Sequence, residues 1–75
     1  MFYVEIEDGF LDITEEKYET YSQAVSRLWT YGETNNIEYE SQATIFDENL
    51  KLLETFRYCK EKKGYRPIEK PDWQC

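Results

Sequence analysis

The sequence predicts an α+β domain: an antiparallel sheet of about four strands, arranged as two hairpins, with one helix packed across one face. Two stretches in which apolar and polar residues alternate, at 2–14 and 37–57, indicate the hairpins. A helical pattern with marked ends separates them at 20–32. Because 75 residues build only one core, we expect a single domain at 1–63, followed by an extended C-terminal tail at 64–75.

The first hairpin begins at the N-terminus. Apolar side chains at even positions of 2–7 alternate with polar ones at odd positions, which predicts a strand with one apolar face. Asp8-Gly9 suits a tight type I′ turn. Residues 10–14 are therefore expected to form the return strand.

The helix has a signal at each end. Thr20 followed by Gln23 is a capping box, in which the two side chains satisfy free backbone amides at the helix start. Gly32 stands where a left-handed C-terminal cap is expected. Steps of three and four place the apolar side chains between these ends on one face: Tyr21, Ala24, Val25, Leu28 and Trp29.

Residues 14–20 admit two interpretations. In one, a helix begins at Glu15 behind a cap at Thr14. In the other, the second strand continues to Tyr18 and the helix begins at Tyr21. We prefer the second, because the capping box is the better helix-start signal.

The second hairpin follows a polar loop at 33–36. Residues 37–46 indicate one strand, or two pieces with a bulge near Ser41-Gln42. Asp47-Glu48-Asn49 is typical of a turn. Residues 50–57 alternate as a strand, while 50–63 also fits a helix; we expect the strand.

The predicted core lies between the helix and one sheet face. The sheet is expected to contribute to this core Phe2, Val4, Ile6, Ile45, Leu52 and Phe56, and the helix Tyr21, Val25, Leu28 and Trp29.

In the tail, two prolines favour an extended chain, which Tyr65, Ile68 and Trp73 would anchor.

Charge is distributed unevenly along a chain of net charge −7. Residues 1–49 hold 12 acidic and two basic residues, whereas residues 50–75 hold four acidic and seven basic ones. Phosphate groups would be repelled by the acidic part, so direct nucleic-acid binding is not expected. A larger protein with a basic surface is the expected partner.

The two cysteines, Cys59 and Cys75, match neither a disulfide scaffold nor a zinc site. We expect free thiols in a reducing compartment. The N-terminus has no signal-peptide pattern and no apolar run is long enough to span a membrane. A cytoplasmic location is the expectation.

Three residue sets are candidates for binding, and each also has a purely structural interpretation as a solvated surface or as core. None is conspicuous as a motif. The acidic set is Glu5, Glu7, Asp8, Asp12, Glu15, Glu16 and Glu19; the aromatic set is Tyr3, Tyr39, Tyr65 and Trp73; the basic cluster is Arg57, Lys60, Lys62, Lys63 and Arg66.

Catalytic chemistry has no counterpart in the sequence. There is no histidine, no glycine-rich phosphate loop and no nucleophile elbow. Cys59 would lack a histidine base. We therefore expect no enzyme activity, no cofactor and no metal site.

Residues 18–24, Leu28, Tyr31-Gly32 and residues 43–49 resemble a pattern in small ββαββ proteins of phages and mobile elements. The resemblance covers residues 18–58 at most, and Leu50 stands where such a turn often has glycine. It implies an inhibitor of host machinery in the host cytoplasm, such as an anti-CRISPR or other anti-defence protein, that acts by occupying a surface.

The sequence thus favours a small, acidic, non-enzymatic inhibitor that occupies a surface of a larger, locally basic protein. The alternative is a structural or assembly subunit that forms a homo-oligomer or packs in a larger particle. These two functions differ in the mass expected in solution.

Overall fold

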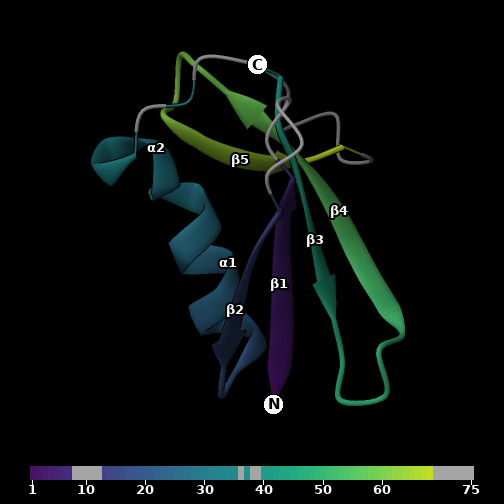
Figure 1. The fold of residues 1–75 in the computed structure, drawn as a ribbon. Helices are drawn as coiled ribbons and strands as arrows, with labels where there is room; N and C mark the ends of the chain where they lie inside the picture. The colour runs from purple at the N-terminus through teal and green to yellow at the C-terminus, as the bar shows by residue number, and fades with distance from the viewer. Residues whose placement is uncertain (8–12, 36, 38–39, 69–75) are drawn as a thin grey trace.

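The computed structural model describes residues 1–7, 13–35, 37 and 40–68. Within them the elements are β1 (Phe2–Glu7), β2 (Ile13–Tyr18), α1 (Tyr21–Trp29), α2 (Tyr31–Thr34), β3 (Gln42–Phe46), β4 (Leu52–Cys59) and β5 (Gly64–Pro67). The strands form one antiparallel sheet in the order β2-β1-β3-β4-β5 (Figure 1). The predicted α+β class is confirmed, with one strand and one short helix more than predicted.

The first hairpin pairs β1 with β2 in an unbroken register from Phe2 opposite Tyr18 to Glu7 opposite Ile13. Strand β2 ends at Tyr18, as the preferred interpretation predicted, and residues 10–12 of the predicted return strand lie outside the described residues. Its side chains alternate poorly because β2 is an edge strand that is mostly exposed. The predicted turn at Asp8-Gly9 lies outside the described residues.

Helix α1 begins at Tyr21, as preferred. The Thr20 hydroxyl accepts a hydrogen bond from the Gln23 amide at 3.1 Å, and the Gln23 side-chain oxygen accepts one from the Thr20 amide at 3.2 Å. This reciprocal pair confirms the capping box and satisfies two helix-start donors.

The predicted cap at Gly32 is wrong. Gly32 lies inside α2 without a positive φ. Its amide donates to the Lys63 carbonyl oxygen at 2.8 Å, and a Cβ there would lie 2.7 Å from that oxygen. Position 32 therefore requires glycine because the backbone of α2 there meets the backbone at Lys63.

The second hairpin is made of strands, so the helical alternative for 50–63 is wrong. One Asp47 carboxylate oxygen accepts from the amides of Asn49 at 2.8 Å and Lys51 at 2.9 Å. This turn reverses the chain before β4, with Leu50 held at a left-handed φ of 62°. The bulge lies between Ile45 and Phe46 rather than near residues 41–42.

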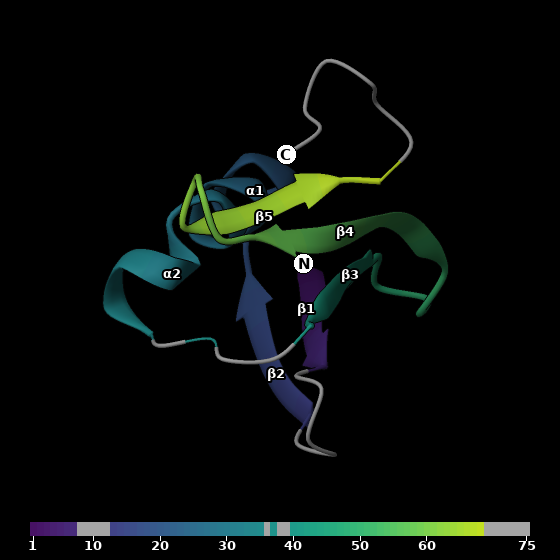
Figure 2. The ribbon, with the colours of Figure 1, turned by 90° about the horizontal axis from the view of Figure 1, so that it is seen from above.

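Residues 64–67, predicted as part of the tail, form β5 along β4. The sheet twists strongly, so that β4 and β5 run across the direction of β1 and β2 (Figure 2). This brings β5 against both helices. Residues 69–75, with Trp73, lie outside the described residues.

The core forms where α1 and α2 cover the sheet. Leu52, predicted to lie in the core, is 56 % exposed, because the bulge sets it opposite Phe46 instead of in line with Phe56. The buried apolar cluster is Val4, Ile6, Ala24, Leu28, Tyr31, Ala43, Ile45, Phe56 and Tyr65, with Phe2, Tyr21 and Val25 partly buried against it.

The prediction of free thiols is wrong for Cys59, which is disulfide-bonded and buried. Cys75, the other cysteine of the sequence, lies outside the described residues. Disulfides persist in oxidising surroundings, so the reducing compartment assumed from the cysteine count does not follow. Among the described residues, no helix is long and apolar enough to cross a membrane.

Candidate binding face

The helices leave the other side of the sheet uncovered, and we call this side the open face. Alternation along β1, β2 and β3 assigns residues to it, because neighbours directly opposite share a face. Its central members are Tyr3, Glu5, Glu7, Glu15, Lys17, Thr44 and Phe46.

Two carboxylates of the open face are direct cross-strand neighbours. Glu5 of β1 lies opposite Glu15 of β2. Like charges in this position destabilise a sheet. Among the described residues neither carboxylate forms an ion pair, so negative charge is concentrated at this point of the face.

A hollow of about 390 Å³ lies beside this pair. Its walls combine the two carboxylates with Tyr3, Phe46 and Leu50. Leu50, at the tip of the β3–β4 turn, is 69 % exposed, the largest exposed fraction among the large apolar residues described. Apolar walls beside two anions match the chemistry of a lysine or arginine side chain, which has an apolar stem and a cationic end.

Among the described residues, Lys17 is the one basic residue that lines this hollow. Its amine lies 5.6 Å from the centre of the Tyr3 ring, a cation–π distance. The open face thus already holds one lysine against an aromatic ring, next to the carboxylate pair.

The predicted acidic set is only partly assembled. Glu5, Glu7 and Glu15 share the open face, and Glu19 is exposed before α1. Glu16 points to the helix side, where one of its oxygens lies 3.6 Å from Arg27 Nε. Asp8 and Asp12 lie outside the described residues, and the register sets Glu15 opposite Glu5.

Two tyrosines connect α1 and β2 to carboxylates. The Tyr18 hydroxyl donates to Glu16 at 2.8 Å and the Tyr21 hydroxyl donates to Glu54 at 2.5 Å. Burial, followed by the hydrogen bond to the carboxylate and its charge, raises the pKa of each tyrosine to about 12.

These shifts predict a loss of stability in alkali. An unfolded tyrosine ionises near pH 10.0 whereas Tyr18 and Tyr21 ionise near 12, so between these values the folded state holds more protons. The contribution of these two tyrosines to the free energy of unfolding is fully present below pH 10 and is lost as the pH rises towards 12. Urea unfolding at pH 8 to 11 measures this, and Tyr21→Phe should make the fall shallower; an unchanged slope would contradict the assignment.

The predicted aromatic set does not form one surface. Tyr3 is half-buried on the open face. Tyr65 was predicted as a partner-binding residue, but its side chain is 0 % exposed, so that prediction is wrong. Tyr39 and Trp73 lie outside the described residues.

The basic cluster is also divided. Arg66 packs against α1 and not beside the other basic residues. Its guanidinium stacks 4.0 Å from the Trp29 ring centre and donates to the Trp29 carbonyl oxygen at 3.2 Å. Arg57 is exposed on β4, and Lys62 on the β4–β5 turn. Lys60 and Lys63 line a second hollow, of about 740 Å³, between that turn and α2.

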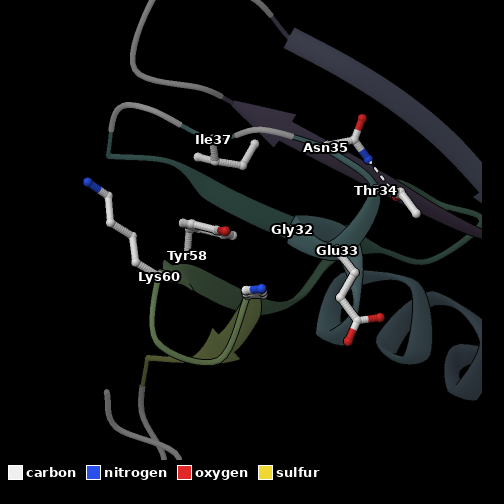
Figure 3. Close-up of a pocket in the computed structure, with 8 residues that line it drawn as sticks. Gly32, Glu33, Thr34, Asn35, Ile37, Tyr58 and Lys60 are labelled. Carbon is white, nitrogen blue, oxygen red and sulfur yellow. Dashed lines mark hydrogen bonds between the residues drawn. The ribbon is translucent and has the colours of Figure 1, made fainter.

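In this second hollow the carboxylate of Glu33 and the amine of Lys60 do not converge (Figure 3). Glu33 and Lys60 stand on opposite sides of it, with their charged ends pointing away from each other (Figure 3). The Asn35 amide donates to the Thr34 hydroxyl at 3.0 Å instead of pointing free into the space. We therefore regard the open face as the better candidate site.

No group of three or more histidine, cysteine, aspartate or glutamate residues in the described part of the chain could hold a metal ion. No protein-family model, curated protein or solved structure matches the chain. The site is therefore argued from its geometry alone.

Sequence reasoning missed Phe46 and Leu50 as site residues. Phe46 alternates with buried Ile45, which assigns it to the opposite face once residues 42–46 are accepted as a strand. Leu50 carries a signal of its own: an apolar side chain directly after a turn rich in polar residues.

Proposed function

We propose that this protein is a non-enzymatic binding domain whose open face docks on a basic surface of a larger protein and blocks that surface. The observation that carries the proposal is the direct opposition of Glu5 and Glu15 beside the apolar hollow. The pair weakens the sheet of the free protein, and a cation from a partner would convert repulsion into attraction.

The hollow supports one mode of docking. A partner lysine or arginine lays its stem against Phe46 and Leu50 and brings its charge to the carboxylates. Further basic groups of the partner follow the acidic row along β1, which extends to Glu7. Such steering increases the association rate and weakens as salt screens it.

The test is capture of partners from a lysate on the tagged protein, kept oxidised, followed by affinity measurement at low and high salt. Glu5→Lys with Glu15→Lys should lower the affinity for the captured protein at least about tenfold at low salt. The matched control is Glu40→Lys with Glu61→Lys, which changes the net charge equally at exposed sites outside the open face. An equal loss of affinity in both double variants would mean that net charge alone explains the effect, and would contradict the proposal.

Leu50 yields a second prediction with two readouts. A left-handed backbone strains leucine but not glycine, so Leu50→Gly should raise the free energy of unfolding by about 0.5–1 kcal/mol. The same change should weaken partner binding about tenfold, because an exposed anchor is lost.

Lys63 is the matched control, since its φ is 55° and it is exposed away from the open face. Lys63→Gly should stabilise similarly and leave the affinity unchanged. If Leu50→Gly stabilises without weakening binding, Leu50 is not an anchor.

A structural subunit is the second candidate function, favoured by the exposure of Leu52 and Leu53 near the same turn. It requires self-association. Sedimentation that shows a monomer at high concentration and in high salt would remove it.

A further inference from the structure

The sheet has two outer strands, β2 and β5. Their edges differ in whether another strand could pair with them. The β5 side is closed. Strand β5 is short and ends in Pro67, which lacks an amide donor; Gly64 packs against the Trp29 carbonyl, and Lys63 just before β5 accepts from Gly32. The helices therefore occupy the start of this edge.

The β2 edge is open. It is longer than β5, contains no proline or glycine, and follows β1 without a bulge. In an antiparallel pair, every second residue turns its N–H and C=O away from the partner strand. Within the described part of the chain, no hydrogen bond from backbone or side chain occupies this outer row of β2.

We infer that the β2 edge binds an extended, basic segment of a partner protein as an added strand beside β2. This inference rests on the proposed function for the basic character of the partner, and it adds the backbone of β2 as a separate contact. Main-chain bonds would give affinity and side-chain pairs would give selectivity, as in strand addition generally.

Charge defines the occupant. An added strand would meet Glu15 and Lys17 on the open face, and Glu16 on the helix face, where Glu16 already lies 3.6 Å from Arg27. A lysine or arginine opposite Glu15, the cross-strand neighbour of Glu5, would therefore be paired rather than repelled. Opposite charges directly across a strand pair are favourable, and like charges are unfavourable.

The net charge disfavours a second copy of this chain as the occupant. In a two-fold antiparallel pairing of β2 with itself, directly opposite residues share a face. The axis must then lie midway between the two copies of one residue. The register centred on Glu15 sets Glu15 against Glu15, whereas the register centred on Glu16 sets Glu16 against Glu16 and each Glu15 opposite a Lys17. Two chains of net charge −7 also repel one another. Repulsion between two acidic chains therefore favours a basic partner strand over self-pairing.

The probe is a short synthetic peptide of alternating lysine and valine, titrated at low salt into the oxidised full chain labelled for NMR. Its matched control carries N-methyl groups on consecutive amides, which keep the charges but block both edges of the peptide strand. The expected result is slowed amide exchange at alternate residues of 13–18, and binding of the control at least about tenfold more weakly.

Each other outcome overturns the inference in a different way. If both peptides bind equally and perturb Tyr3, Glu5 and Leu50 while β2 amides exchange as before, docking uses side chains alone; the proposed function stands and the inference fails. If neither peptide binds, both fail. If β2 amides become protected without peptide as protein concentration rises, with a doubled mass, the occupant is a second copy and the inference is wrong.

Discussion

Replacing Gly64 by alanine is expected to lower the free energy of unfolding by about 3 kcal/mol, the upper range for overpacking. A Cβ at this position would lie 1.7 Å from the Trp29 carbonyl oxygen and 2.4 Å from its carbon. These are backbone atoms at the end of α1, so a rotamer change cannot relieve the clash. The helix and β5 must separate, and the stacking of Arg66 on Trp29 is lost with them.

Urea unfolding followed by circular dichroism measures this loss, and Gly32→Ala is the graded comparison. At Gly32 the closest atom is the Tyr58 hydroxyl at 2.3 Å, which can move, followed by the Lys63 carbonyl oxygen at 2.7 Å. Gly32→Ala should therefore destabilise less, and Tyr58→Phe in the same chain should restore part of the loss. A Gly64→Ala protein as stable as Gly32→Ala would contradict the close packing of β5 on α1.

Local signals predicted the parts of this fold that are decided locally. The capping box at Thr20 and Gln23 located the helix start, because its bonds are made within one turn. The alternation of residues 2–7 located β1, since one face of that strand meets the core and the other is uncovered.

Elements that depend on distant partners were harder to predict. The segment 50–63 fits helical and strand periods alike, and pairing with β3 decides for the strand. Strand β5 has neither length nor alternation, and Gly64 and Tyr65 are both buried because helices and sheet enclose it. Its pattern therefore resembles a proline-bearing tail.

The same distinction holds for the open face. Glu5 and Glu15 were both singled out from the sequence, but their opposition depends on a register that is decided by where β2 begins. Residues 13–18 carry too few apolar side chains to reveal that start, because an edge strand buries little. The two carboxylates of the site were predictable from the sequence, whereas Phe46, Leu50 and the geometry of the site were not.

Tyr65→Ala is expected to cost about 4 kcal/mol, as removal of a fully buried ring does. A core of this size supplies only about 3–5 kcal/mol in total, so a large fraction of the variant molecules should be unfolded at 25 °C. The ring meets those of Tyr31 and Tyr58 edge-on, at centroid distances of 5.7 and 5.3 Å. Its loss therefore removes contacts with α2 and β4 together.

Tyr65→Phe and Ser41→Ala separate the ring from its hydroxyl. Ser41 Oγ lies 2.9 Å from the Glu7 carbonyl oxygen, which can only accept, and 2.6 Å from the Tyr65 hydroxyl. The one serine proton goes to Glu7, so Tyr65 is the donor to Ser41. Tyr65→Phe should cost about 1 kcal/mol, and Ser41→Ala more, because it removes both bonds.

Partner affinity in the same variants tests the reassignment of Tyr65 from binding face to core. Tyr65→Phe, which still folds, should bind the partner as the original protein does, whereas Tyr3→Ala on the open face should bind more weakly. A drop in affinity for Tyr65→Phe without a drop in stability would return Tyr65 to the binding surface. Equal stability losses in Tyr65→Phe and Tyr65→Ala would contradict its place at the centre of the core.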